Sequence, residues 1–273
     1  STISDAMAQI AREHGAEIQL NTPVERVLVE GRRTVGVRLA GGEEVRGDEV
    51  VINADFGYAM SELFEPGRIR KYTPSRLSRM ALSCSTFMLY LGVDKVYDLP
   101  HHTIFFAEDY RNNVESVFEG RDLNGDISMY VRNADVTDPT LSPTGHSSLY
   151  ILIPVPNLRG KPDWDSEKEA FRELTLDSLA KRAGMTDLRE HIVEERMITP
   201  LEWRDGANVY EGATFNLAHN WPQLIYLRPR NKFEEFDNCY LVGGGTHPGS
   251  GLPTIYQSGR IAANLITDNG SAG

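Results

Sequence analysis

Apolar and polar residues alternate over much of the chain, in short runs separated by glycine, proline and other turn-forming residues. A side-chain period of two is typical of β-strands, so each run predicts one strand. The predicted strands are 16–20, 24–30, 35–40, 43–46, 50–53, 84–93, 102–107, 127–131, 148–155, 192–198 and 239–242, with weaker strands at 212–217 and 223–227.

Helical spacing of apolar residues occurs in fewer places. Capping boxes at Ser166 with Glu169 and at Thr199 with Glu202 mark the starts of two helices, and Gly184 marks an end. The predicted helices are 4–14, the beginning of 58–77, 166–183, a shorter one from 200, and 254–266. Strands and helices together predict a mixed α/β (α+β) fold.

The stretch 239–266 combines a short apolar strand, a glycine-rich turn and a helix. Three consecutive glycines end the strand, and Pro253 has the φ that suits a first helical turn. The beginning of a helix presents unpaired N–H groups and a partial positive charge, which favour an electron-rich ligand. The turn therefore indicates a cofactor site, although an ordinary turn between a strand and a helix remains an alternative.

Composition excludes several classes of protein. The 273 residues carry a formal net charge of −11, with 40% hydrophobic and 25% charged residues, so we expect a globular protein without a nucleic-acid partner. The two cysteines, Cys84 and Cys239, lie in apolar runs and predict buried thiols in a reducing cytoplasm. The histidines, cysteines and carboxylates lack the spacing of a metal site, and no apolar run has the roughly 20 residues of a transmembrane helix.

The ordered stretch from Leu241 to Pro253 resembles the carboxy-terminal flavin-binding signature of the bacterial phytoene desaturases, the FAD-dependent carotenoid desaturase family. Five other segments resemble that family in the same order, and the resemblance covers nearly the whole chain: 87–92, 101–104, 150–156, 199–200 and 228–231. It implies FAD as cofactor, a long isoprenoid hydrocarbon such as phytoene as substrate, and desaturation in carotenoid biosynthesis.

The resemblance also implies the domain organisation. Residues 1–60 and 228–268 would be parts of a Rossmann-like FAD-binding domain, and 61–227 a substrate-binding domain on a mixed or antiparallel sheet with flanking helices. The family's G-x-G-x-x-G turn does not occur before Gly243. We therefore expect the 273 residues to be part of a larger protein, and we expect this chain by itself to lack FAD and to be inactive.

Site residues follow from the same resemblance. Those expected to bind the cofactor are Val24, Asn53, Ala54, Asp55, Gly244, Gly245, Thr246, Gly251, Leu252, Pro253 and Ile255. His247 is the candidate catalytic residue, beside the flavin, and the alternative is a turn histidine bonded to backbone. The protein mainly positions reactants in flavin chemistry, so no acid–base residue is required.

Two features concern the substrate and the membrane. The strands between 84 and 155 are rich in aromatic residues, which predicts a core and also allows one wall of an apolar tunnel. Arginines and a lysine gather between Arg68 and Arg79, indicating either a solvated surface or contact with an anionic membrane, and hence a peripheral membrane protein. Related flavoenzymes (a carotenoid isomerase, a saturase or an amine oxidase) and a carrier of apolar ligands remain alternatives.

Overall fold

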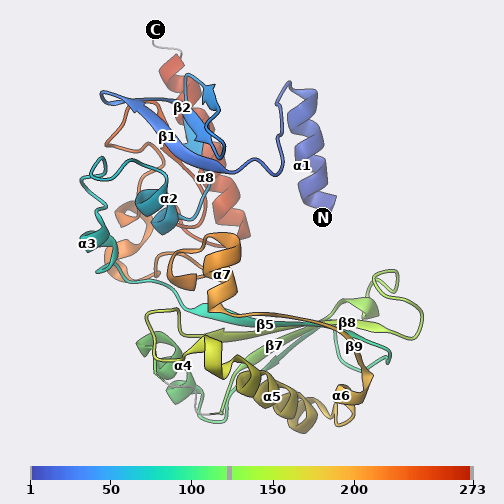
Figure 1. Cartoon of the computed structure of the whole chain (residues 1–273). Helices are drawn as coiled ribbons and strands as arrows, with labels where there is room; N and C mark the ends of the chain where they lie inside the picture. The colour runs from blue at the N-terminus through green and yellow to red at the C-terminus, as the bar shows by residue number, and fades with distance from the viewer. Residues whose placement is uncertain (1, 122–124, 271–273) are drawn as a thin grey trace.

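The computed structural model describes residues 2–121 and 125–270, and it contains three sheets. Two of them lie in one half of the molecule and the third in the other half (Figure 1). The mixed α/β fold with a parallel strand pair and an antiparallel sheet is confirmed. Where the boundary between cofactor and substrate domains falls stays a prediction.

The first half is built around a parallel pair of strands. β4 (Val50–Ile52) pairs with β10 (Cys239–Leu241), although nearly the whole chain separates them in sequence. An antiparallel meander, β1 (Val24–Glu30), β2 (Arg33–Leu39) and β3 (Glu44–Arg46), lies beside them. The helices of this half are α1 (Thr2–Glu13), α2 (Phe56–Glu62), α3 (Pro74–Leu77) and α8 (Leu252–Gly270).

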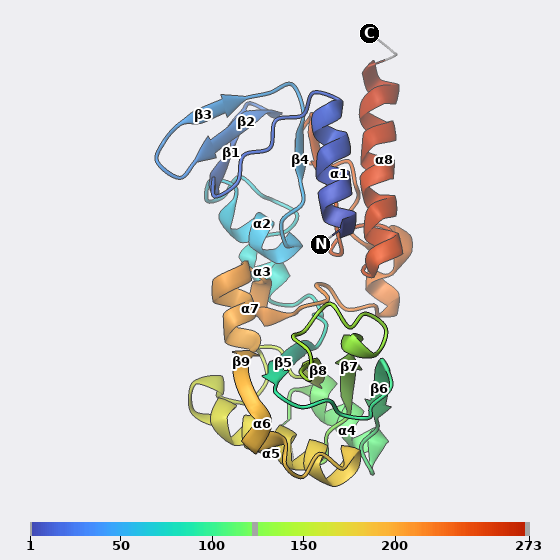
Figure 2. The same cartoon turned by 90° about the vertical axis from the view of Figure 1, so that its right-hand side faces the viewer.

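The second half is a five-stranded antiparallel sheet in the order β6-β7-β8-β5-β9. Its strands are β5 (Ser85–Val93), β6 (His102–Phe105), β7 (Met129–Asn133), β8 (Ser147–Val155) and β9 (Ile192–Ile198). Helices α4 (Tyr110–Glu119), α5 (Trp164–Ala183) and α6 (Leu188–His191) lie on one side of it, and α7 (Pro200–Ala207) follows β9 on the other side (Figures 1 and 2).

Each half has its own buried core. One core joins α5 to the helix-facing side of the five-stranded sheet, where Phe87, Trp164 and Phe171 contact one another. The other core joins β1, β4 and β10 to α2 and to the segment that ends at Leu77. Burial of these apolar side chains, at about 25 cal/mol per Å², is the main force that holds each half together.

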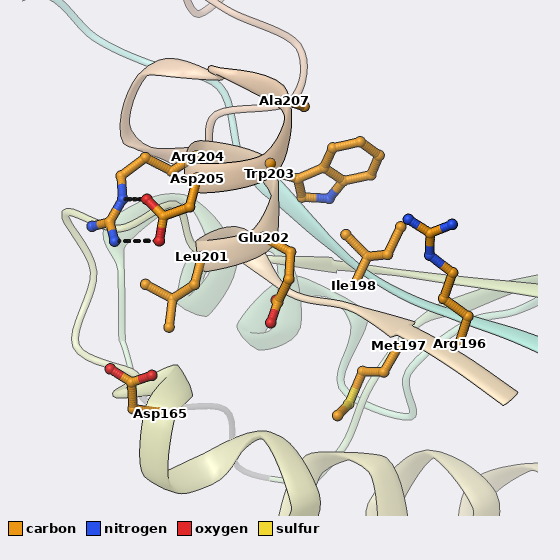
Figure 3. A pocket seen from close by; sticks show the side chains of 11 residues that line it. Asp165, Arg196, Met197, Ile198, Leu201, Glu202, Trp203, Arg204, Asp205 and Ala207 are labelled. Carbon is orange, nitrogen blue, oxygen red and sulfur yellow. Dashed lines mark hydrogen bonds and ion pairs between the residues drawn. The ribbon is translucent and has the colours of Figure 1, made fainter.

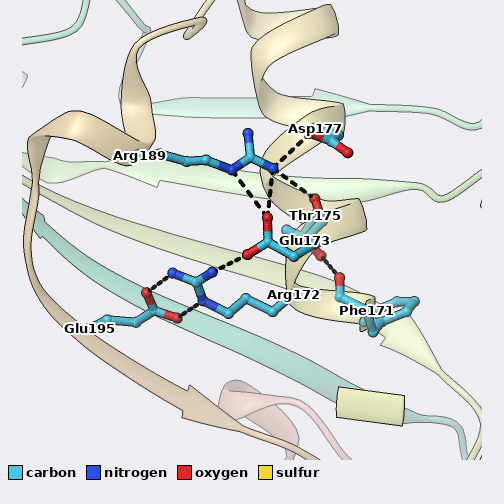
Figure 4. A network of polar contacts seen from close by, with 7 residues as sticks. All are labelled: Phe171, Arg172, Glu173, Thr175, Asp177, Arg189 and Glu195. Carbon is cyan, nitrogen blue, oxygen red and sulfur yellow. Dashed lines mark hydrogen bonds and ion pairs between the residues drawn. The ribbon is translucent and has the colours of Figure 1, made fainter. Parts of the chain in front are cut away.

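Charged side chains fix α5 against the edge of the five-stranded sheet (Figure 4). Arg172 of α5 binds both carboxylate oxygens of Glu195 in β9, with its Nη2 2.6 Å from Oε2. Arg189 of α6 reaches back to Glu173 and Asp177 of α5. Bidentate arginine–carboxylate pairs have a defined geometry, so this network sets how α5 and α6 lie on β9.

Several local predictions were wrong. Residues 16–20 form no strand, because no described segment of the chain pairs with them. Residues 212–217 and 223–227 form 3-10 turns and loop, apart from a pairing of Leu217 with Leu82. Helix α4 was missed because it buries the polar Asn113 and Ser116 and exposes Phe118, the reverse of the usual pattern.

The cap of α5 also differs from the prediction. The helix begins at Trp164 and is capped by Asp163, whose side chain accepts a hydrogen bond from the N–H of Asp165. Glu167, and not Glu169, returns the bond to the backbone N–H of Asp163. The predicted box at Thr199 and Glu202 is confirmed at the start of α7.

Candidate cofactor and substrate site

The carboxyl ends of β4 and β10 lie side by side, because the two strands are parallel and in register. Asn53 to Asp55 leave β4 at the point where the turn from Gly243 leaves β10, and the N–H of Val242 bonds the carbonyl of Ile52 across the pair. Side chains and backbone that follow parallel strands collect at one edge of a sheet, which is where open α/β sheets place ligands. Most of the predicted cofactor residues therefore meet here.

Asp55 joins three parts of this edge. Its Oδ1 accepts a hydrogen bond from the N–H of Tyr58 at 3.0 Å and caps α2, while its Oδ2 accepts one from Asn216 Nδ2 at 2.5 Å. Burial raises the pKa of the Asp55 carboxyl, and the N–H donors of α2 oppose that rise. Asn216 also bounds the position of Gly245, so the carboxylate, the amide and the turn form one packed unit.

This pKa predicts how stability depends on pH. A carboxyl with a raised pKa in the folded state contributes stability below its unfolded pKa and loses that contribution as pH rises through the folded pKa. We expect Asp55→Asn, which keeps a capping oxygen, to gain free energy of unfolding relative to the wild type as pH rises from about 4. Urea denaturation at several pH values measures this. The exposed Asp48→Asn is the control, and parallel curves for wild type and Asp55→Asn would contradict the expectation.

Gly245 is buried and closely surrounded by protein atoms. A Cβ added there would lie 2.5 Å from Asn216 Oδ1 and closer still to Phe56 Cβ. Thr246 is also buried, and its hydroxyl donates to the carbonyl of Gly243 at 3.0 Å. These two residues are required by the packing of the turn itself, whatever ligand the turn holds.

The beginning of α8 differs from the rest of the turn because it is open. Gly251, Leu252 and Pro253 are exposed, and the N–H groups of Gly251 and Leu252 have no hydrogen-bond acceptor within residues 2–121 and 125–270. Gly251 has φ +103°, a conformation that residues with a Cβ rarely adopt. Ile255 is half-buried, and its N–H bonds the carbonyl of Gly251 at 3.0 Å.

The remaining predicted residues lie less centrally. Asn53 is exposed and its Oδ1 lies next to Gly243, while Ala54 packs against the core of this half. Gly244 is half-buried against Ser250. Val24 begins β1 opposite Leu39, and none of the described contacts joins it to the turn.

His247 has the contacts of a turn histidine. Its Nδ1 lies 3.0 Å from the carbonyl of Ile225, its backbone N–H donates to the carbonyl of Pro229, and its ring stacks on Tyr226. Since a carbonyl only accepts, Nδ1 carries the proton in this arrangement. A catalytic role for His247 stays a prediction, and its contacts match the alternative.

Arg228 is a site residue that the sequence reading did not single out. Its guanidinium is buried, and it donates to the carbonyls of Leu217, Ala218, Gln223 and Gly244, at 2.7 Å to the last. No carboxylate among the described residues pairs with it, and burial lowers its pKa to about 10, which leaves it charged at neutral pH. The only sequence signal was its place in the segment 228–231.

Among the described residues, one cavity lies beside the glycine turn and another lies beside α7. One, of about 590 Å³, borders the turn and is lined by Tyr226, Arg228, Phe233, His247 and Leu265 among others. The other, of about 660 Å³, lies between β9, α7 and the start of α5 (Figure 3). Its walls carry Asp165, Arg196, Glu202 and the Arg204–Asp205 ion pair, so it is too polar to suit a hydrocarbon.

No group of three or more histidine, cysteine or acidic side chains in the described part of the chain is arranged to hold a metal ion. Both thiols are shielded: burial raises the pKa of Cys84 to about 11 and that of Cys239 to about 12. Neither is therefore a nucleophile at neutral pH.

The family model described as flavin containing amine oxidoreductase matches residues 1–267. The chain belongs to this family. It is 53% identical over 265 residues to the 4,4'-diapophytoene desaturase (4,4'-diapolycopene-forming) of Methylomonas sp, covering 97% of this chain and 52% of that protein. It is 45% identical over 276 residues to the all-trans-zeta-carotene desaturase of Myxococcus xanthus, covering 99% of this chain and 52% of that protein.

Among solved structures, the chain resembles an oxidoreductase from Methanosarcina mazei with a TM-score of 0.61 and 16% identity, over 96% of this chain and 53% of that one. At this identity the likeness shows the fold. The chain spans about half the length of the curated relatives that it matches. The recognised resemblance to carotenoid desaturases is thus confirmed.

Proposed function

We propose that the protein to which this chain belongs is an FAD-dependent oxidoreductase that introduces double bonds into a long isoprenoid hydrocarbon. The observation that carries the proposal is the 53% identity, over nearly the whole chain, to a 4,4'-diapophytoene desaturase. The edge formed by β4, β10 and α8 supports it, because open N–H groups at a helix start suit the electron-rich part of a flavin.

The chain's own residues would bind and orient the reactants. The N–H groups of Gly251 and Leu252 would hold the flavin edge, and Gly245 with Thr246 would keep the turn in shape. FAD, when bound, would be the hydride acceptor, and a proton would leave the neighbouring carbon of the substrate. The substrate offers only apolar area, so its binding would depend on burial against the face of the five-stranded sheet opposite α4, α5 and α6.

A chimera tests this function. The chain would replace the matched part of the Methylomonas enzyme, and we expect a yellow protein that desaturates 4,4'-diapophytoene in liposomes. We expect the 273 residues alone to purify colourless and inactive, since the chain spans only about half of its relatives. If the chimera binds flavin, leaves the hydrocarbon unchanged and oxidises amines, the amine oxidase alternative holds and the desaturase proposal is wrong. If the 273 residues alone were yellow and active, this would contradict the expectation that residues outside this chain complete the FAD site.

We also propose peripheral contact with the cytoplasmic face of a membrane through the segment 68–79. None of the helices within residues 2–121 and 125–270 has the length and apolar character needed to span a bilayer. The segment is partly neutralised, because Lys71 pairs with Glu234 and Glu235 accepts from the backbone N–H groups of Arg70 and Lys71. Arg68 donates to the carbonyl of Gly31 and remains exposed.

Sedimentation with anionic liposomes tests the contact. Each basic residue near such a surface is worth about 1 kcal/mol, so changing Arg68, Arg70 and Lys71 together to Glu should release most of the protein. The matched control makes the same change at three basic residues of the other half, namely Arg111, Arg121 and Lys181. Equal sedimentation of the two variants would assign the contact to another surface.

A further inference from the structure

The face of the five-stranded sheet opposite α4, α5 and α6 carries α7 at one end, where Trp203 Nε1 donates to the carbonyl of Thr86 in β5, and strand register arranges the side chains of this face in two rows. One row is apolar apart from a tyrosine and runs Ile104, Tyr130, Leu152, Met88, Ile198. The next row runs His102, Arg132, Tyr150, Tyr90, Arg196. Each row crosses all five strands, so the two lie side by side along the sheet.

This face lies on the side where the glycine turn is. Figure 1 places α4, α5 and α6 on one side of the sheet and the half with β4, β10 and α8 on the other. The helix-facing side contains the buried Phe87, Leu89 and Ile151, so the alternate residues Met88, Tyr90 and Tyr150 point toward the other half. Met88 is buried there, whereas Tyr90 and Tyr150 are half-buried, so the sheet's tyrosines remain partly accessible on this face.

The tyrosine rings are held in a fixed geometry. The ring of Tyr150 meets that of Tyr90 at a centroid distance of 5.3 Å and that of Tyr130 at 5.9 Å, both edge-on. The hydroxyl of Tyr130 lies 2.7 Å from His102 Nδ1, and the His102 ring stacks on the ring of Tyr130. Rings oriented in this way present both faces and edges to whatever lies on the sheet.

Two guanidinium groups stand near the ends of the second row. The side chain of Arg196 is exposed and makes no ion pair or hydrogen bond within the described residues. The side chain of Arg132 is exposed and, among the residues that the structure describes, donates only to His101 Nε2, at 3.3 Å. A cation without a carboxylate partner is available to an electron-rich surface, and the attraction of a cation to π electrons extends over about 6 Å.

Rings and cations together distinguish two kinds of hydrocarbon chain. A chain with isolated double bonds and one with conjugated double bonds bury similar apolar area, so area alone does not separate them. A conjugated chain has a continuous π cloud that adds aromatic contact and cation–π attraction. The accessible members of the apolar row, which do not include the buried Met88, would hold either chain, and the tyrosine–arginine row would favour the conjugated one.

We propose that Tyr90, Tyr150, Arg132 and Arg196 recognise the conjugated part of a partly desaturated substrate, so that an intermediate is held more tightly than the starting hydrocarbon. This inference rests on the proposed function, because it assumes an isoprenoid chain on this face. It assigns to the row a role in specificity, and it makes later desaturation steps easier than the first.

Binding of two matched lipid probes to the 273-residue chain tests the preference. The probes are parinaric acid methyl ester, a fluorescent conjugated tetraene, and methyl linolenate, which has the same length and isolated double bonds. Direct fluorescence gives the Kd of the first, and displacement gives that of the second. We expect the conjugated ester to bind roughly tenfold more tightly, a ratio that corresponds to about 1.4 kcal/mol.

The variants separate rings, hydroxyls and charge. Tyr90→Leu with Tyr150→Leu should remove most of the preference, Tyr90→Phe with Tyr150→Phe should keep it, and Arg196→Gln should lower it about threefold. The Arg196 side chain has no partner to lose in the described part of the chain, so that variant stays informative if the leucine pair unfolds the sheet. Tyr110→Leu, on α4 and 52% exposed in the wild type, is the control.

Each outcome separates the inference from the function on which it rests. Equal binding of both esters by the wild type would overturn the inference and leave the apolar surface in place. Loss of the preference in the phenylalanine pair would assign it to the hydroxyls and also overturn the inference. Binding of neither ester would reject this face as the substrate surface and, with it, that part of the proposed function.

Discussion

Replacing Arg228 with methionine is expected to lower the free energy of unfolding by about 3 kcal/mol or more. The guanidinium supplies donors to four carbonyls that have little access to water, and one of them belongs to Gly244 in the glycine turn. Removing the buried charge relieves its desolvation cost, and this gain partly offsets the stability lost with the hydrogen bonds. The carbonyl of Ala218 keeps a hydrogen bond from Gln223 Nε2 at 3.2 Å, so the carbonyls of Leu217, Gln223 and Gly244 would be the ones left without a donor among the described residues. Each buried acceptor left without a donor costs about 1–3 kcal/mol, so their combined cost should outweigh that relief.

Urea denaturation measures the effect, and Arg196→Met is the matched control. Arg196 is exposed and makes no ion pair in the described part of the chain, so its replacement should change stability by no more than about 0.5 kcal/mol. The free energy of unfolding of Arg228→Lys should lie between those of the wild type and Arg228→Met, because an ammonium keeps the charge and reaches fewer carbonyls. Equal stability of Arg228→Met and wild type would mean that the carbonyl network contributes nothing net.

Replacing Gly245 with valine should cost roughly 3 kcal/mol and distort the site edge. The added Cβ meets Asn216 Oδ1 at 2.5 Å and the Cβ of Phe56, which sits too close to its own backbone to move away. Since Asn216 also binds Asp55, the displacement should loosen the cap of α2. A loss on this scale is a large part of the free energy of unfolding of a typical domain, which is about 5–15 kcal/mol.

Gly259→Ala provides the control for Gly245→Val. Gly259 lies in α8 with open space around its Cβ position, so alanine should stabilise the helix by about 0.5–1 kcal/mol. Thermal and urea unfolding of the two variants should therefore move in opposite directions. A Gly245→Val protein within about 1 kcal/mol of wild type would show that Phe56 and Asn216 yield easily. In the full-length protein, Gly251→Val is expected to weaken FAD binding, through backbone strain at φ +103° as well as through any lost contact, and an unchanged flavin content after purification would contradict this.

The predicted cofactor residues show how far sequence reasoning reached. The strand, turn and helix at 239–266 were predicted correctly, because glycine, proline and apolar spacing are local signals. The partner loop of that turn was not predicted. Asn216 lies in the first of two weak strands read within a loop, His219 lies between them, and Arg228 follows the second, and none of the three was singled out for its contacts with the turn. Their roles depend on which backbone groups the fold brings within reach, and local spacing does not encode this.

The sequence by itself determined most strands, most helix starts and the turn after β10, since each follows from side-chain period, capping or backbone preference within a few residues. Only the tertiary structure decided that β4 pairs with β10, that Arg228 is buried among carbonyls, and that tyrosines from three strands meet in rows. Each depends on register between distant segments. Residues 16–20 show the converse: their alternation predicts a strand, yet a strand forms only where a neighbour completes its hydrogen bonds.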